Sequence, residues 1–242
     1  MASGNDGREG VRLNRFLAEA GAASRRGADR MIEDGRVTID GRRAALGDKV
    51  RIGERVCVDG KEVERVEEDI ILAFYKPVGI TSTSSPDDED NVISFIGYPK
   101  RIFSVGRLDK DSEGLLLMTN NGDLADRVMR SRNGHEKEYV VRVDKDLTEE
   151  FLRRMSAGVR LDDGRVTREC DVEATGPREF RVVLRQGLFR QIRRMCSQLG
   201  YEVRALKRVR VANIELGDLK EGRYRDLSKK EREELYRLTG LR

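Results

Sequence analysis

Three short apolar runs, each followed by turn-forming residues, most constrain what this chain can fold into. The runs and the turns after them are 70–75 before Lys76-Pro77, 102–105 before Gly106, and 115–118 before Asn120-Asn121-Gly122. Predominantly apolar runs of this kind are typical of strands buried on both faces. Helical patterns lie between the strands without the steady alternation of a doubly wound sheet. The sequence therefore predicts an α+β fold with a mixed, largely antiparallel sheet.

The first quarter of the chain has a different pattern. After a polar, Gly-rich segment at 1–10, expected to be disordered, apolar spacing predicts a helix that ends at Gly21. Ser24 is a good N-cap for a second helix, and Asp40-Gly41 and Asp59-Gly60 predict hairpin turns. We therefore predict a small domain at 11–67 and a larger one at 68–242. Arginines crowd the small domain, at Arg12, Arg15, Arg25, Arg26, Arg30, Arg42 and Arg43.

The segment from Arg12 to Arg42, RLNRFLAEAGAASRRGADRMIEDGRVTIDGR, resembles the S4 RNA-binding domain. The resemblance implies a helical face that binds the phosphates and shape of structured RNA and performs no chemistry. Arg12, Arg15, Arg25, Arg26 and Arg30 are then the expected RNA contacts. Because acids lie among these arginines, a diffuse charged surface remains the alternative.

Composition excludes several classes of protein. Hydrophobic and charged residues each make up 38% of the chain, and no apolar run approaches the roughly 20 residues of a membrane span. We expect a cytoplasmic protein, because the N-terminus lacks the apolar centre of a signal peptide. Cys57, Cys170 and Cys196 have no zinc-ligand spacing and are expected to be buried and reduced. The single histidine, His135, is expected in a solvent-facing loop.

Asp109, in Gly106-Arg107-Leu108-Asp109, is the strongest candidate for a catalytic group. It follows a strand and a glycine turn, where active-site loops commonly lie. A nucleophilic carboxylate needs shelter from water and a cation that keeps it ionised. In two other interpretations Asp109 only caps the turn, or begins a calcium loop with Asp111 and Glu113. The calcium interpretation is weak because position twelve is Asn120, not a bidentate glutamate.

A basic stretch near the C-terminus supplies candidate cations. Between Leu184 and Arg210 there are eight basic residues and one acid, which favours polyanion binding over a merely solvated helix face. Apolar spacing predicts a helix at 188–199. Arg193 lies at the edge of its core stripe, where a buried guanidinium needs a carboxylate. We therefore expect an ion pair between Asp109 and Arg193.

Four motifs occur in a fixed order behind the S4-like segment. They are Lys76-Pro77-x-Gly79, Gly106-Arg107-Leu108-Asp109 through Gly114-Leu115-Leu116, Lys137-Glu138-Tyr139, and Arg190-Gln191-Ile192-Arg193-Arg194-Met195. Together they resemble the ribosomal RNA pseudouridine synthases that join an S4 domain to a catalytic domain. The segments 133–139 and 148–158 are most similar to the F-type large-subunit enzymes.

The resemblance assigns roles to single residues. It implies that Asp109 acts at the glycosidic bond of a uridine, on either the ribose or the base, and that Arg193 is its paired arginine. Tyr139 is implied to stack on the uracil and to assist removal of the C5 proton, whereas its alternative is a packed strand tyrosine. Arg107 is implied to fill the gap left when the nucleotide flips out. Lys76, Arg190 and Arg194 are the remaining expected RNA contacts. Lys76 also looks structural, shaping the pocket floor with Pro77, and a surface lysine before a turn is as good an interpretation of it as an RNA contact.

The resemblance also sets expectations for partners and cofactors. Isomerisation requires no cofactor and no metal, and the sequence has no Walker loop and no dinucleotide-binding fingerprint. The expected partner is a structured stem-loop of ribosomal RNA, most of all of the large subunit (23S), and the expected state is a monomer. Small-subunit RNA or a tRNA stem-loop remain open as substrates. A non-catalytic S4-type ribosome assembly protein and a carboxylate-dependent hydrolase are the alternatives of other classes.

Overall fold

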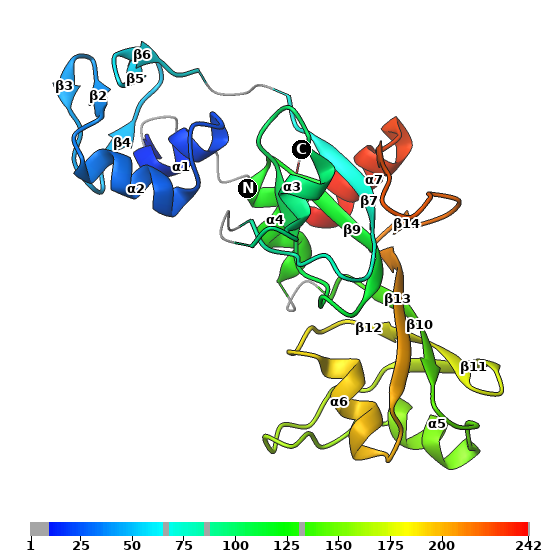
Figure 1. Ribbon diagram of the computed structural model, residues 1–242. Coiled ribbons are helices and arrows are strands. Elements are labelled where there is room, and N and C mark those ends of the chain that lie inside the picture. Colours follow the sequence, from blue (N-terminus) through cyan, green and yellow to red (C-terminus); the bar gives the residue numbers. More distant parts are fainter. Residues whose placement is uncertain (1–9, 65–67, 85–87, 131–133, 242) are drawn as a thin grey trace, which may run out of the picture. The chain divides into compact units, whose positions relative to one another are not determined.

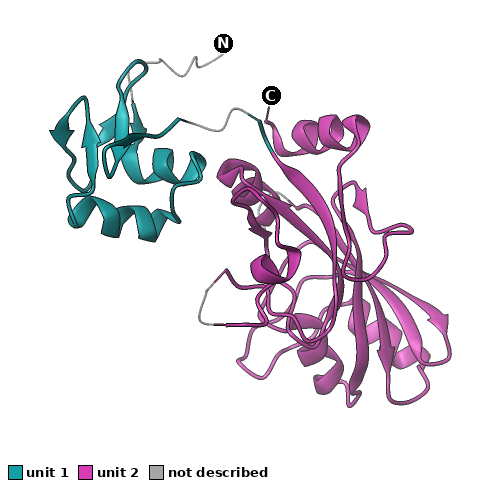
Figure 2. Ribbon diagram, turned by 45° about the horizontal axis from the view of Figure 1, so that its top comes forward, with its two compact units in different colours: residues 1–69 teal, residues 70–242 magenta. Residues whose placement is uncertain are grey.

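The computed structural model describes residues 10–64, 68–84, 88–130 and 134–241. The chain divides into two compact units, an N-terminal unit of residues 1–69 and a C-terminal unit of residues 70–242 (Figure 2). The segment expected to be disordered, 1–10, lies outside the described residues apart from Gly10. Within the described ranges, no helix combines the length and the apolar character needed to cross a membrane.

The N-terminal unit has two helices packed on small sheets. Ser24 caps the second helix, since its hydroxyl accepts a hydrogen bond from the Gly27 N–H at 3.0 Å. Asp40 and Asp59 take positive φ before their glycines, as two-residue hairpin turns require. The elements are β1 (Val11–Arg12), α1 (Leu13–Glu19), α2 (Arg25–Glu33), β2 (Val37–Ile39), β3 (Arg42–Arg43), β4 (Lys49–Val50), β5 (Val56–Val58) and β6 (Lys61–Glu62).

The C-terminal unit is built on a nine-stranded sheet whose main path runs β11-β12-β10-β13-β9-β7-β15 (Figure 1). All but one of its strand pairings are antiparallel, which confirms the predicted α+β class with a largely antiparallel sheet. Its strands are β7 (Ile71–Lys76), β8 (Phe103–Val105), β9 (Glu113–Thr119), β10 (Lys137–Val143), β11 (Asp171–Gly176), β12 (Glu179–Leu184), β13 (Val203–Val211), β14 (Ile214–Glu215) and β15 (Tyr224–Asp226).

In the described part of this unit five helices cover the sheet, because each half of it has apolar side chains to bury. Helices α5 and α6 pack on the β10–β12–β13 half (Figure 1), whereas α3, α4 and α7 pack on the β7–β9 half. Ser228 and Glu231 form a capping box at the start of the last helix. The helices are α3 (Val92–Ile96), α4 (Gly122–Met129), α5 (Glu149–Ser156), α6 (Gln191–Gln198) and α7 (Lys229–Thr239).

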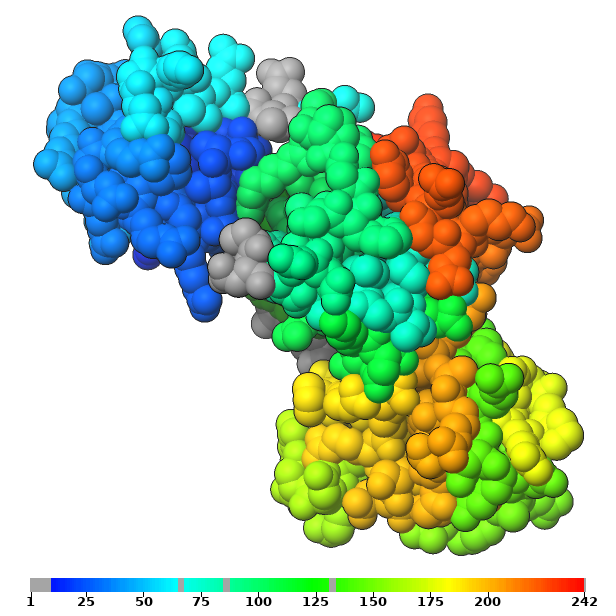
Figure 3. Space-filling view, viewed as in Figure 1, coloured from blue at the N-terminus to red at the C-terminus, as the bar shows by residue number. Residues whose placement is uncertain are grey.

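The two halves of the sheet meet where β13 runs parallel to β9. Only two residue pairs form this seam, Lys207 with Glu113 and Arg208 with Gly114. In the space-filling view the yellow-to-orange part meets the green part at a narrowed waist (Figure 3). Tyr139 of β10 packs against the core clusters of both halves. The seam is therefore where residues from distant parts of the sequence come together.

Two predictions about the elements need correction. The helix expected at 188–199 begins at Gln191, because Arg190 takes a left-handed conformation (φ 46°) that a helix cannot include. β13 was not predicted, since its alternating arginines do not look like a buried strand. The three free cysteines are buried, as expected. His135 lies in the loop before β10, as expected, and is partly exposed, and its partial burial lowers the pKa of the imidazole.

Candidate active site

A pocket of ≈ 100 Å³ opens at the seam of the sheet. Its walls come from the loop after β8, from β10, from β13 and from the turn before α6. Asp109, Tyr139, Arg107 and Arg190 all line it, so four of the residues singled out in the sequence meet in one place. The lining residues are Arg107, Leu108, Asp109, Ser112, Tyr139, Leu184, Gln186, Gly187, Leu188, Arg190, Gln191, Ile192 and Leu206.

The loop that carries Asp109 is held from both sides. Ser82 is buried, and its hydroxyl donates to the Leu108 carbonyl at 2.8 Å and accepts from the Leu108 N–H at 3.0 Å. The Ser112 N–H donates to the Asp109 carbonyl at 3.1 Å. Only 29% of the Asp109 side chain is exposed. The carboxylate is therefore sheltered and faces the pocket with a fixed backbone.

Arg190, not Arg193, is the arginine beside Asp109. Its Nη1 lies 3.5 Å from Asp109 Oδ2, and it donates two hydrogen bonds to the Asp111 carboxylate, at 3.1 and 2.8 Å. The hydrogen bond from Arg190 is the main cause that lowers the pKa of Asp111. Among the described residues no Asp109–Arg193 ion pair occurs, so that expectation is wrong. The left-handed turn at Arg190 is what carries its guanidinium over the loop.

Arg193 instead binds the backbone of the catalytic loop. Its Nη2 donates to the Asp111 carbonyl at 2.8 Å and lies 3.3 Å from Ser112 Oγ, while Nη1 donates to the Val203 carbonyl at 3.2 Å. Its Nε is 3.4 Å from the Asp111 carboxylate. Arg193 therefore ties α6, the Asp111 loop and the start of β13 together.

Lys76 is a buried cation beneath the same loop. The side chain is fully buried, and Nζ donates to the carbonyls of Pro77 at 2.7 Å and Ser112 at 2.8 Å. A side chain with no exposed surface cannot reach an RNA phosphate, so the expected RNA contact is wrong and the structural alternative holds. Burial lowers the pKa of Lys76 to about 8, although the carboxylates of Asp109 and Asp111 oppose this shift.

We expect Lys76 to make the free energy of unfolding rise with pH between about 8 and 10.5. The unfolded chain keeps the lysine proton to higher pH than the folded chain, because folding lowers the pKa from 10.5 to about 8. Unfolding therefore becomes less favourable across this range, by about 3 kcal/mol for a shift of this size. The Lys76→Met variant should lack this term.

Urea unfolding of both proteins at pH 7.5 and 9.5 tests this expectation. For each protein we take the change in the free energy of unfolding between the two pH values, and we subtract the change of the variant from that of the wild type. The contributions of all other titrating groups cancel in this difference. A parallel pH dependence of the two proteins would show that Lys76 titrates normally and is not buried as a cation.

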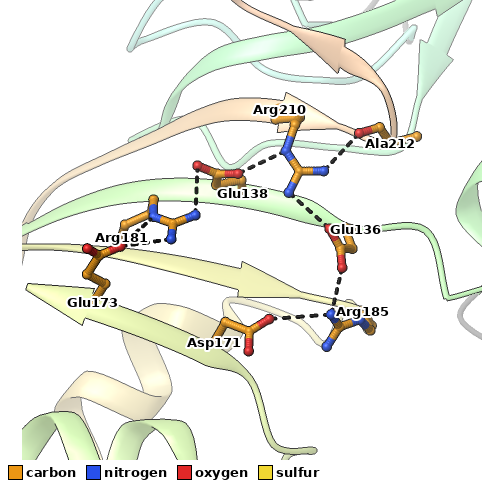
Figure 4. Close-up of polar contacts among 8 residues, drawn as sticks. All are labelled: Glu136, Glu138, Asp171, Glu173, Arg181, Arg185, Arg210 and Ala212. Carbon is orange, nitrogen blue, oxygen red and sulfur yellow. Dashed lines mark hydrogen bonds and ion pairs between the residues drawn. The ribbon is translucent and has the colours of Figure 1, made fainter.

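The basic stretch between Leu184 and Arg210 is largely neutralised. Figure 4 shows arginines and carboxylates alternating across β10, β11, β12 and β13. Arg210 donates to Glu138 at 2.9 Å and to Glu136 at 3.0 Å, and Arg185 binds Glu136 and Asp171. Cross-strand ion pairs therefore take up much of the local excess of positive charge. Fewer unpaired arginines are left on this face to bind a polyanion than the sequence suggests.

Arg194 is another member of that stretch whose charge is taken up locally. Its guanidinium is 16% exposed and is paired with both Asp162 and Asp163. An RNA phosphate would have to displace two carboxylates to bind it. We therefore expect Arg194 to stay bound to these two carboxylates and not to bind RNA.

The sequence did not identify Ser82 and Arg208 as parts of the site. Arg208 is 2% exposed, and its Nε donates to the Leu115 carbonyl at 2.7 Å while Nη1 lies 3.5 Å from the Arg107 carbonyl. It thus holds β9 and the Gly106 turn to β13. The only available signal for Arg208 was its place among the eight basic residues between Leu184 and Arg210, which we interpreted as favouring polyanion binding.

The arginines of the N-terminal unit lie on its surface. Arg25 and Arg26 are exposed in the first turn of α2, and Arg30 is exposed in its last turn. Arg12 is also exposed, whereas Arg15 is half-buried and bonded to Glu19 at 2.6 Å. Beneath them α1 and α2 bury a small core, so the arginine-bearing helices have a fixed geometry.

Comparison with known proteins gives this pocket its context. A family model described as RNA pseudouridylate synthase matches residues 70–198, more than half of the chain. The chain belongs to the RNA pseudouridylate synthase family. A second model, the S4 domain, matches residues 11–56, a range that includes the segment from Arg12 to Arg42 that resembles that domain. Both parts of the expected architecture are thereby confirmed.

Individual relatives agree with the family. The chain is 50% identical over 230 residues to the dual-specificity RNA pseudouridine synthase RluF of Escherichia coli strain K12, covering 94% of this chain and 79% of RluF. It is 35% identical over 225 residues to the ribosomal large subunit pseudouridine synthase B of Bacillus subtilis strain 168, covering 90% and 92%. A crystal structure of a pseudouridylate synthase superposes with a TM-score of 0.69 at 26% identity, covering 93% of this chain and 99% of that one.

These similarities decide between the classes of protein that the sequence analysis left open. The F-type resemblance is confirmed by the identity to RluF, and the enzyme class is that of the RNA pseudouridine synthases. A purely non-catalytic S4-type protein is not favoured, because the family match lies on the C-terminal unit that carries the pocket. The hydrolase alternative has no support from any of these relatives.

Proposed function

We propose that this protein converts a uridine of large-subunit ribosomal RNA to pseudouridine, with the target nucleotide flipped into the pocket at the sheet seam. The observation that carries the proposal is the meeting of Asp109, Tyr139 and Arg190 in one pocket. In the reaction the bond from the ribose to N1 breaks and a bond to C5 forms. The C5 proton is lost and N1 gains one, so no oxidant or reductant is consumed.

Each group in the pocket has a task that its position supports. Asp109 is the proposed catalytic carboxylate, because it is sheltered and has Arg190 within ion-pair distance. Tyr139 is half-buried between two core clusters, so its ring presents a fixed surface on which a uracil can stack. Arg107 is exposed at the rim, where it can occupy the space that a flipped nucleotide leaves.

We also propose how the domains and partners divide the work. Residues 11–67 bind structured RNA through Arg12, Arg15, Arg25, Arg26 and Arg30, and residues 68–242 perform the isomerisation. We propose that the protein acts as a monomer, as its resemblance to the family leads us to expect. A ribosomal RNA substrate places the protein in the cytoplasm, as expected from the sequence.

The substrate is tested by mapping pseudouridines in ribosomal RNA and tRNA from cells with and without this protein. Loss of a single large-subunit site supports the proposal, and purified protein should restore it in a transcript of that RNA. Because RluF is named for dual specificity, tRNA is mapped in the same cells. If pseudouridine is lost only from small-subunit RNA or tRNA, the large-subunit assignment is wrong.

The role of Arg190 leads to a prediction of its own. The Arg190→Met variant should lower kcat by about a hundredfold, because Asp109 loses its neighbouring cation. Arg194→Met is the matched control, since Arg194 belongs to the same segment but is paired with Asp162 and Asp163. Single-turnover formation of pseudouridine in the transcript gives both rates. A hundredfold loss in the control, or none in Arg190→Met, would contradict the assignment.

A further inference from the structure

Phe189 is the most exposed aromatic side chain in the described part of the chain. Its exposure is 74%, whereas the next aromatic residues, Phe95 and Tyr224, reach 45% and 42%. Exposing a phenylalanine ring to water forgoes the stabilisation that burial would bring. Such a ring deserves a functional explanation when it lies beside an active site, and this one is flanked in sequence by two residues that line the pocket, Leu188 and Arg190.

The backbone around Phe189 is held so that the ring stays outside. Leu188 and Gln191 bond to each other twice, from the Gln191 N–H to the Leu188 carbonyl at 3.2 Å and from the Leu188 N–H to Gln191 Oε1 at 3.0 Å. Arg194 Nη1 lies 3.5 Å from the Phe189 carbonyl. Arg190 adds the left-handed conformation that closes this turn. Strained turns of this kind are concentrated at functional sites.

The surroundings of the ring indicate what it binds. The residues around it in sequence include Gln186 and Arg190, which are polar, partly exposed and line the pocket. In the described segment 184–194 Phe189 is the one large hydrophobic residue that is exposed, so this segment does not build the wide apolar patch that a protein partner would need. An exposed aromatic ring next to arginines is the arrangement that binds unpaired nucleobases by stacking. A uridine that enters the pocket must first unstack from its neighbours in the RNA.

We propose that Phe189 is a stacking platform for an unpaired nucleobase that adjoins the target uridine. This inference rests on the proposed function, because it takes the pocket to be the place where the uridine binds. The ring of Phe189 replaces the stacking that the neighbouring base loses when the uridine leaves the strand. Phe189 thus contributes to the binding of flipped RNA and takes no part in the chemistry.

Kinetics on the large-subunit ribosomal RNA transcript test the proposal. Phe189→Ala should raise KM about tenfold, the effect typical of losing one base–aromatic stack, and leave kcat within about twofold. Phe189→Tyr should retain the wild-type KM, since it keeps the ring. An unchanged KM in Phe189→Ala would overturn the proposal, and so would self-association of the wild type that the alanine variant abolishes.

A fluorescence measurement separates this inference from the proposed function. The chain contains no tryptophan, so Phe189→Trp introduces a single reporter at the rim. Its emission should be quenched by oligouridine decamers but not by duplex RNA that has no unpaired bases. The control, Tyr224→Trp, places the reporter on β15 at the edge of the sheet and should not respond. If the rim reporter is quenched but no RNA is isomerised, only the proposed function fails, whereas isomerisation without quenching refutes only the stacking role.

Discussion

Asp109→Asn is expected to reduce formation of pseudouridine by at least about a thousandfold while the affinity for RNA stays within about threefold. The amide cannot act as a nucleophile, so the proposed attack on the target nucleotide is lost. Binding should persist because contacts to phosphates dominate affinity for nucleic acids. The rate is measured by single-turnover conversion of the transcript, and the dissociation constant by filter binding at one fixed salt concentration.

The control for this prediction is Asp111→Asn on the same loop. Asp111 has the closer hydrogen bonds to Arg190, but it is more exposed than Asp109, at 48% against 29%, and does not line the pocket. We expect this variant to lose about tenfold in rate, because Arg190 is then held less firmly. If Asp111→Asn is inactive and Asp109→Asn is not, then Asp111 is the catalytic carboxylate and the assignment of Asp109 is wrong.

Local signals explain why much of the fold could be predicted. Ser24 and Ser228 cap helices through contacts within three residues, and Asp40-Gly41 needs only its own backbone to form a turn. Strand β7 is buried throughout, and it is apolar up to Lys76 because both of its faces are covered. β13 was missed because it is not apolar: its Arg210 is stabilised in the sheet by Glu138 of β10 and by Glu136 just before that strand, which the sequence alone does not place beside it.

The site was predicted in part for the same reason. Asp109 and Tyr139 were found because they belong to contiguous motifs, and the structure brings both to one pocket. The choice between Arg190 and Arg193 depends on where α6 begins. The helix begins after Arg190, which takes a left-handed conformation that a sequence normally indicates by a glycine, and here the residue is an arginine. The burial of Arg208 was missed and that of Lys76 was left open, because buried cations bonded to backbone carbonyls look like surface residues in a sequence.

The position of the pocket follows from the way the sheet is joined. Tyr139 belongs to one half of the sheet and Asp109 follows a strand of the other, so their separation is set by the seam between β13 and β9. That seam has two residue pairs, reinforced by the Arg208 side chain across it. Any change that widens the seam should therefore disturb stability and catalysis together.

Gly114→Ala should widen the seam between β9 and β13. Gly114 has φ +106°, and a Cβ atom there would lie 2.2 Å from the Arg208 carbonyl oxygen and 2.7 Å from its amide nitrogen. Both are backbone atoms of the paired strand, so the strand itself has to move. We expect the free energy of unfolding to fall by at least about 3 kcal/mol, from the positive φ and the clash combined. The rate should also fall about a hundredfold, because a shift of about 1 Å separates the catalytic groups.

Gly164→Ala is the matched control for this prediction. Gly164 also has a positive φ, +82°, but a Cβ atom there meets nothing within 4 Å. Its unfolding free energy should therefore fall by only about 1 kcal/mol, with an unchanged rate. Urea unfolding and single-turnover kinetics on both variants separate the effect of backbone strain, which both share, from the effect of the clash with β13, which only Gly114→Ala has. Equal losses in the two variants would mean that the contact between β9 and β13 does not govern the pocket.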